Sequence, residues 1–234
     1  MPFVTVRGRR IHYHVEGDGP PLFLAHGFRA SMDDWRQMGY VDALKGEYRL
    51  IVVDSLGHGL SDRPPDLREY RPVHMAAGVV AVLDAAGVET TNFLGHSMGG
   101  WAGWQTAKLA PERLRSLITA NSPPQDIHPP THPVLTLFTD PGVVIDPDTP
   151  VEPFGMMEAL PGITVPVLVF GGEEDPMLPD IRAAAALLPN AEFFTLPGLS
   201  HRQAITRIDL VLPRVRRFLQ AVESGQRRRL PRPE

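Results

Sequence analysis

The pentapeptide Gly95-His96-Ser97-Met98-Gly99 contains a serine in a spacing that can support covalent catalysis. A serine hydroxyl is a weak nucleophile at neutral pH. It attacks a carbonyl carbon only when a base accepts its proton and hydrogen-bond donors stabilise the oxyanion. The G-x-S-x-G spacing is typical of a strained strand-to-helix turn that holds the hydroxyl above a sheet. Residues 91–94 favour a short buried strand and residues 98–110 favour a helix, so we predict that Ser97 is a nucleophile.

A candidate acid and a candidate base stand further along the chain. Asp175 follows the apolar run of residues 165–170, and His201 follows the run of residues 192–196. Both are therefore expected at carboxyl ends of strands, the edge of the sheet that also carries Ser97. His201 would accept the serine proton, and Asp175 would stabilise the imidazolium that results. The carboxylates that compete with Asp175 for this role are Glu173, Glu174 and Asp126.

The elements that must position these residues alternate between strand-like and helix-like segments. Continuous apolar runs indicate strands buried on both faces, and the amphipathic segments between them indicate helices. The fold class expected from this order is α/β, with a mostly parallel sheet that helices cover on both faces. The expected strands are residues 3–6, 11–15, 22–25, 50–53, 91–94, 114–120, 165–170 and 192–196. The expected helices are residues 31–45, 73–86, 98–110, 181–188 and 204–222.

A proline-rich stretch interrupts this alternation. Residues 121–162 contain ten of the 25 prolines and lie just before the strand that precedes Asp175. Loops of this length in compact domains are usually functional or disordered, so we predict a short lid, with a surface loop as the alternative. Residues 1–234 are otherwise expected to form a single domain, ending in a disordered tail over residues 223–234.

Composition limits the classes of function. The 23 basic and 27 acidic residues give a net charge of −4, which argues against a nucleic-acid partner. The chain has no cysteine, so disulfides and thiolate metal sites are excluded. No secretory signal pattern and no membrane-length apolar run is present, so we expect a cytoplasmic protein with a small-molecule substrate and no membrane partner. Prolines separate His128 from His132, so no metal or other cofactor is expected.

Taken together, these motifs resemble the α/β-hydrolase superfamily, in the small single-domain branch that runs from esterases and lactonases to C–C bond hydrolases. The resemblance covers about residues 3–222. The matching segments are His26-Gly27-Phe28, residues 54–61, residues 95–100, residues 172–175 and residues 198–201. The resemblance implies an oxyanion hole formed by the backbone N–H groups of Phe28 and Met98. Because each stands in a backbone motif, His26 and His96 are expected to be structural, and Asp54 is expected to anchor backbone N–H groups.

The function expected from this resemblance is that of a carboxylesterase-like serine hydrolase. It would cleave a small, largely apolar ester, lactone or thioester through an acyl-enzyme on Ser97. The residues predicted to line the substrate pocket are Phe28, Phe138, Met157, Met177 and Leu199. A serine in place of aspartate at position 97 argues against the haloalkane dehalogenase and epoxide hydrolase branches.

Two other classes of function remain open at this point. The same triad could serve C–C bond hydrolysis, perhydrolysis, or a biosynthetic cyclisation or isomerisation. A C–C hydrolase is expected to hold its acidic substrate with a cap arginine, but residues 121–162 contain neither arginine nor lysine. The third class is a non-catalytic ligand-binding protein on a hydrolase scaffold, and a complete triad argues against it.

Overall fold

The computed structural model describes residues 2–124 and 155–229. Most of the predicted lid, residues 121–162, lies outside the described residues, as do Phe138, Asp126, His128 and His132. The fold and the candidate site are therefore described from the two remaining segments, which contain every strand discussed below.

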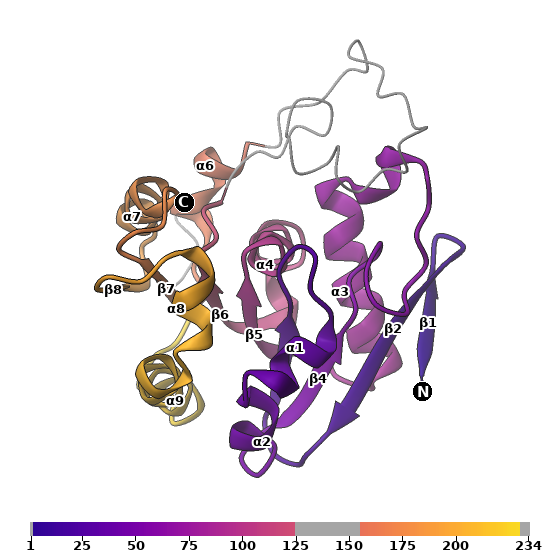
Figure 1. The fold of residues 1–234 in the computed structure, drawn as a ribbon, viewed down its shortest axis with the longest axis horizontal. Helices are drawn as coiled ribbons and strands as arrows, with labels where there is room; N and C mark the ends of the chain where they lie inside the picture. The colour runs from indigo at the N-terminus through magenta and orange to yellow at the C-terminus, as the bar shows by residue number, and fades with distance from the viewer. Residues whose placement is uncertain (1, 125–154, 230–234) are drawn as a thin grey trace.

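One eight-stranded sheet forms the centre of the molecule (Figure 1). Its strand order is β1-β2-β4-β3-β5-β6-β7-β8; β1, β2 and β4 pair antiparallel in turn, and the pairs from β4 to β8 are parallel. The bounds are β1 (Phe3–Val6), β2 (Arg9–Glu16), β3 (Pro21–Ala25), β4 (Arg49–Val53), β5 (Thr91–His96), β6 (Leu114–Ala120), β7 (Val167–Gly172) and β8 (Ala191–Leu196). The mostly parallel sheet predicted from the continuous apolar runs is confirmed.

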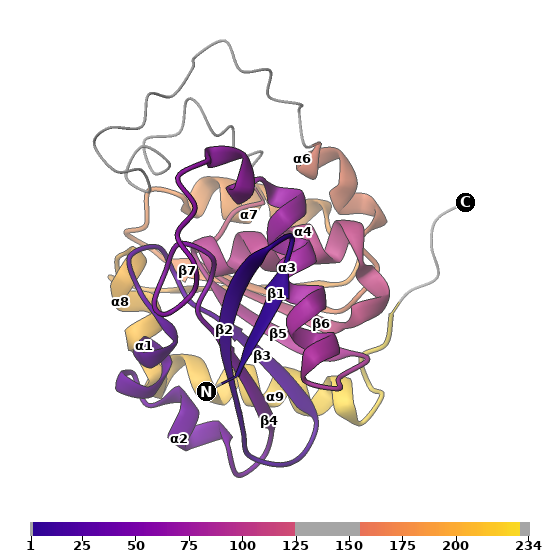
Figure 2. The ribbon, with the colours of Figure 1, turned by 90° about the vertical axis from the view of Figure 1, so that its right-hand side faces the viewer.

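Helices cover both faces of this sheet (Figures 1 and 2). The helices on one face are α3 (Pro72–Ala85), α4 (Met98–Leu109), α6 (Met156–Ala159) and α7 (Leu178–Leu187). Those on the other are α1 (Met32–Gln37), α2 (Tyr40–Leu44), α8 (His201–Thr206) and α9 (Ile208–Glu223). Three 3₁₀ turns are η1 (Leu67–Tyr70), η2 (Pro111–Arg113) and η3 (Leu160–Gly162). Within the described residues, no helix has the length and apolar character needed to cross a bilayer.

Two hydrophobic cores result from the alternation of side chains along the strands. In β3, Phe23 packs into the core beneath α3, α4 and α7, whereas Leu22 and Leu24 pack into the core beneath α1, α2 and α9. All three of these side chains are almost completely buried. A continuous apolar run therefore serves both faces of the sheet at once.

Two helices expected to be continuous are broken. The helix predicted over residues 31–45 is divided into α1 and α2, because Gly39 adopts a positive φ of 86° at the start of α2. The helix predicted over residues 204–222 is divided into α8 and α9 at Arg207, whose ψ of 65° is not helical. The short helix α8 begins at His201, directly after its N-cap Ser200, whose capping box with Gln203 fixes that start.

Part of the predicted disordered tail packs against the body of the protein. Arg227 pairs with Glu192 of β8 and stacks on the Phe218 ring, and the Arg229 guanidinium donates to the Leu114 carbonyl oxygen at 2.9 Å. Residues 224–229 are therefore held by side-chain contacts that the basic composition of the segment did not indicate. Residues 230–234 lie outside the described residues.

The first turn of α4 lies unusually close to the sheet. A Cβ atom on Gly99 would lie 2.1 Å from the carbonyl oxygen of Ala25, and one on Gly95 would lie 2.4 Å from that of Gly99. Neither backbone oxygen can move aside without disturbing β3 or α4. Glycine at these positions is therefore a requirement of packing, and it fixes the height of Ser97 above the sheet.

We predict that Gly99→Ala lowers the free energy of unfolding by about 3 kcal/mol, because α4 must move away from β3. Urea unfolding followed by circular dichroism measures this loss. Gly46→Ala is the matched control, since a Cβ there meets no atom within 4 Å. The control should be neutral or slightly stabilising. Equal losses in the two variants would contradict the packing argument.

Candidate active site

Ser97 occupies the turn between β5 and α4 in a strained backbone conformation. Its φ is 52° and its ψ is −117°, a combination that residues other than glycine rarely adopt. The Ser97 amide donates to the Ala120 carbonyl oxygen at 2.9 Å, which ties the turn to the end of β6. This is the geometry that the G-x-S-x-G spacing predicts, with the serine above the carboxyl edge of the sheet.

His201 and Asp175 form a hydrogen-bonded pair near this turn. His201 Nδ1 lies 2.9 Å from Asp175 Oδ2; the His201 side chain is 30% exposed, while that of Asp175 is completely buried. Because an ionised carboxylate only accepts hydrogen bonds, Nδ1 is the protonated atom of the neutral ring. His201 Nε2 then carries the lone pair, as a general base requires.

Asp175 is kept ionised by the hydrogen bonds that it accepts. Burial acts to raise the pKa of its carboxyl group. Hydrogen bonds from His201, from Asn121 Nδ2 at 2.5 Å and from the Met177 amide at 3.0 Å outweigh burial, and they leave the pKa below its ordinary value. Of the competing carboxylates, Glu173 accepts from the Gly198 amide.

Asn121 is a residue of this cluster that the sequence analysis did not identify. It directly follows β6, its φ is 52°, and its amide donates to the Phe170 carbonyl oxygen at 2.8 Å. Asparagine tolerates a positive φ better than most residues, which fits its place at a tight turn after a strand. The sequence signal that could have identified Asn121 is its position directly after β6, the neighbour of the strand that precedes Asp175.

Ser97 and His201 line one cavity of about 500 Å³. Phe28 and Met177, which were predicted to line a pocket, also border this cavity, together with Trp35, Met38, Trp101 and Ile205. Met157 and Leu199 are not among its lining residues: Met157 lies on α6 with 39% of its surface exposed, and Leu199 packs against the core beneath α9. The cavity thus brings Ser97, His201, Phe28 and Met177 together.

Two buried histidines hold the loop that carries Phe28. His26 Nε2 accepts from the Ser55 amide at 3.1 Å, and its Nδ1 lies 2.7 Å from the Gly27 carbonyl oxygen. His58 Nε2 accepts from the Arg29 amide at 3.3 Å, and its Nδ1 lies 3.2 Å from the Leu56 carbonyl oxygen. Each ring therefore donates through Nδ1 and accepts through Nε2, which requires a neutral imidazole.

The electrostatics of the cluster favour these neutral rings. Burial lowers the pKa of His26, and burial together with the nearby His26 lowers the pKa of His58 to about 4. His96, whose ring centroid lies 5.2 Å from that of His201, has its pKa lowered to about 3 by burial and by the proximity of a second titratable ring, His201. A histidine this weakly basic cannot serve as a general base near neutral pH.

Asp54 anchors backbone N–H groups, as the sequence predicted. Its carboxylate accepts from the Met32 amide at 2.8 Å, from the Leu60 amide at 3.0 Å and from His12 Nδ1 at 2.7 Å. Burial acts to raise its pKa, but these bonds outweigh burial and lower it. Asp54 thus joins the start of α1 to the loop after β4. Within the described part of the chain, no group of three or more potential ligands could hold a metal ion.

Comparison with known proteins identifies the family of this fold. A family model described as the alpha/beta hydrolase fold matches residues 20–149, more than half of the chain. The chain therefore belongs to the alpha/beta hydrolase fold family. The expected superfamily is confirmed by this match.

Individual relatives carry several hydrolase names. Bifunctional epoxide hydrolase 2 of Mus musculus is 36% identical over 122 residues, which cover 52% of this chain and 22% of the relative. The putative carbamate hydrolase RutD of Azorhizobium caulinodans is 36% identical over 121 residues, covering 52% of this chain and 44% of the relative. The match thus spans less than half of either relative. The solved structure of Est816, described as an N-acyl homoserine lactone degrading enzyme, is 25% identical and superposes with a TM-score of 0.76 over 93% of this chain and 100% of that one.

The low pKa of His58 makes the stability of the protein depend on pH. In the unfolded chain, His58 binds a proton below the ordinary histidine pKa of about 6.5. In the folded protein it binds that proton only near pH 4. Stability is therefore lost as pH falls through this window, by about 1.4 kcal/mol per pH unit for each such proton.

We predict that His58→Gln reduces the pH dependence of stability by about this amount between pH 6 and pH 4.5. Urea unfolding at each pH measures it, and the two dependences should run parallel above pH 7. If the unfolding free energies of the two proteins changed equally with pH over the whole range, the pKa of folded His58 would not be lowered.

Proposed function

We propose that this protein is a serine hydrolase that cleaves a small carboxylic ester, lactone or thioester through an acyl-enzyme on Ser97. The observation that carries the proposal is the hydrogen bond between His201 and buried Asp175, made where His201 lines the same cavity as the strained Ser97. A nucleophile, a base and a group that orients the base are the parts that this chemistry needs.

In the first half of the reaction, Ser97 Oγ attacks the substrate carbonyl carbon while His201 Nε2 accepts the serine proton. The carbonyl π electrons move to the oxygen and form a tetrahedral oxyanion. Met98 is the first residue of α4, where the helix geometry leaves the N–H without an intrahelical acceptor. With the Phe28 N–H it would form the oxyanion hole, aided by the positive end of the helix dipole.

In the second half, the tetrahedral intermediate collapses and the bond to the leaving group breaks. The leaving oxygen or sulfur takes the proton from His201, and the acyl group stays on Ser97. Water then attacks the ester carbon while His201 again accepts a proton, and Ser97 leaves with that proton. Asp175 remains ionised throughout and stabilises each imidazolium, which its low pKa favours.

The character of the cavity supports a small and mostly apolar substrate. A volume of about 500 Å³ is in the range of small-molecule sites. Phe28, Trp35, Met38, Trp101, Met177 and Ile205 supply apolar surface. The charged lining residues are Arg29, Arg202 and Asp34; Arg202 lies 4.0 Å from Asp34 and its side chain is 83% exposed. Apolar side chains thus outnumber charged ones in the described lining.

The relatives divide between carbonyl and epoxide substrates. The names of RutD and Est816 describe a carbamate hydrolase and a lactone-degrading enzyme, which act on carbonyl carbons. The mouse relative is named an epoxide hydrolase. The resemblance assigns a carboxylate nucleophile to the epoxide hydrolase branch, whereas this chain has the hydroxyl of Ser97 at that position. Carbonyl chemistry is therefore the better supported proposal. The same triad could also serve C–C hydrolysis, perhydrolysis or a biosynthetic cyclisation.

We predict that Ser97→Ala lowers kcat for short p-nitrophenyl esters by on the order of 10⁵-fold and abolishes labelling by a fluorophosphonate. The control is Ser122→Ala, which removes a buried hydroxyl that has no hydrogen-bond partner among the described residues. The control should keep activity and labelling. A wild-type protein that neither labels nor hydrolyses any ester, lactone or thioester would sink the proposal, and turnover of styrene oxide by the same sample would favour the epoxide alternative.

Asp175→Asn should lower kcat about 10³–10⁴-fold with little change in KM, because the amide no longer selects the correct histidine tautomer or stabilises the imidazolium. Steady-state kinetics on the best ester gives both constants. Glu173→Gln removes a neighbouring carboxylate that accepts from the Gly198 amide, and it should leave kcat within a few-fold of wild type. The reverse result would assign the acid to Glu173.

A further inference from the structure

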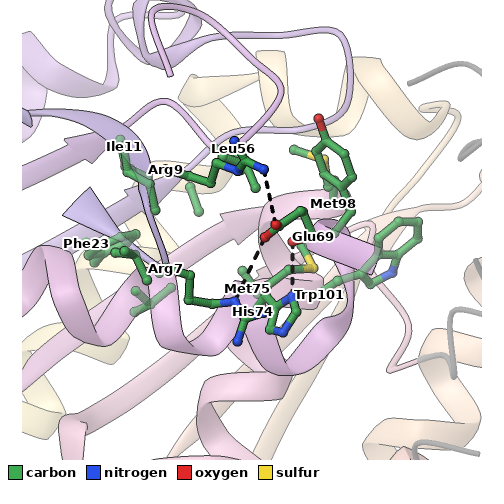
Figure 3. Close-up of a pocket in the computed structure, with 18 residues that line it drawn as sticks. Arg7, Arg9, Ile11, Phe23, Leu56, Glu69, His74, Met75, Met98 and Trp101 are labelled. Carbon is green, nitrogen blue, oxygen red and sulfur yellow. Dashed lines mark hydrogen bonds and ion pairs between the residues drawn. The ribbon is translucent and has the colours of Figure 1, made fainter. Parts of the chain in front are cut away.

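A second cavity is lined by the start of α4 but not by Ser97 (Figure 3). Its volume is about 90 Å³, and it is lined by the β1–β2 hairpin, β3, η1, α3 and the start of α4. Most of the lining is apolar and includes Phe23, Met75, Val79, Met98 and Trp101. Trp101 lines both cavities, whereas Ser97 and His201 line only the catalytic one. The α4 first turn therefore separates two distinct cavities.

A glycine inside α3 lines this cavity. Gly78 lies in the middle of α3, and a Cβ there would lie 3.1 Å from Ile11 Cδ1, closer than ordinary van der Waals contact. Glycine within a helix is unfavourable compared with alanine, and the close approach of α3 to the β1–β2 hairpin accounts for it here. The lining around Gly78 is mostly apolar and suits an apolar ligand group.

The polar groups of the cavity gather at one end and carry more positive than negative charge. Glu69 lies between Arg7 and Arg9, as Figure 3 shows, at 3.9 Å from Arg7 Nε and 3.4 Å from the Arg9 guanidinium. Two arginines thus face a single carboxylate. In addition, Arg9 Nε is buried and has no hydrogen-bond partner among the described residues. A second carboxylate at this end would supply the missing acceptor and balance the charge.

We propose that this cavity binds a short-chain aliphatic monocarboxylate, with its alkyl tail against Met75 and Val79 and its carboxylate beside Arg7 and Arg9. An apolar cavity of about 150 Å³ holds one benzene molecule, so about 90 Å³ suits a tail of roughly four carbon atoms. The proposal does not depend on the chemistry assigned to Ser97, since none of these residues belongs to the catalytic cluster. Hexanoate is a suitable probe, because its five-carbon chain is about the length of this tail and ends in a carboxylate.

Binding can be measured without turnover in the Ser97→Ala protein. Calorimetry with hexanoate should give one site, hexan-1-ol should bind at least about tenfold more weakly, and hexylammonium should not bind, because the polar end is positive. Methyl NMR of the methionines locates the ligand: the Met75 signal should shift, while that of Met177 in the catalytic cavity should not. No binding at millimolar hexanoate, or a shift of Met177 alone, would overturn the proposal.

Variants separate the two halves of the site. Arg9→Gln should weaken hexanoate binding about tenfold and leave hexan-1-ol binding unchanged. Arg10→Gln is the matched control. Arg10 lies on the same hairpin as Arg9 but pairs with Asp62 and does not line the cavity, so hexanoate should bind this variant as it binds the parent protein. Gly78→Leu fills the cavity and should remove binding of both ligands. If that variant does not fold, Gly78→Ala should weaken both several-fold. Equal loss in the Arg9 and Arg10 variants would contradict the assigned position of the carboxylate.

Discussion

The close contact between the first turn of α4 and the ends of β3 and β5 is the constraint on which the site depends. Without side chains at Gly95 and Gly99, the α4 backbone can approach the Ala25 carbonyl oxygen, and Ser97 is held in its strained conformation between two fixed elements. The same contact places the Met98 N–H beside the serine and directs Met98 and Trp101 into a small apolar cluster of their own. Catalytic geometry and core packing are therefore set by one turn of helix.

The buried carboxylates around the site are satisfied by hydrogen bonds. Asp175 and Asp54 are buried carboxylates, and each accepts three hydrogen bonds that outweigh the cost of burial. The histidines that accept backbone N–H bonds are kept neutral by burial, so their rings can hold the Phe28 loop without placing positive charge beside His201. This separation leaves His201 as the histidine that is both paired with a carboxylate and partly exposed in the catalytic cavity.

Much of the fold could be predicted because its signals are local. Runs such as residues 50–53 are apolar throughout, and a strand buried on both faces needs such a run. The helix breaks at Gly39 and Arg207 were missed, because each depends on how two helical segments pack and not on the segments alone. Asn121 was missed for a similar reason: its partner Asp175 is 54 residues away, and only the parallel pairing of β6 and β7 brings them together. Met157 and Leu199 do not line the Ser97 cavity among the described residues, and their role in binding substrate stays a prediction.

The second cavity also could not be predicted from the sequence. Gly78 is an ordinary glycine in the sequence, and only the packing of α3 against the β1–β2 hairpin shows that the position lies close to Ile11 in the wall of the cavity. Because Trp101 borders both this space and the catalytic cavity, the first turn of α4 is a shared wall. Met98 belongs to this wall and to the small apolar cluster with Trp101. The packing of the far cavity and the position of the Met98 N–H, which we propose as an oxyanion donor, are therefore set by the same turn of helix.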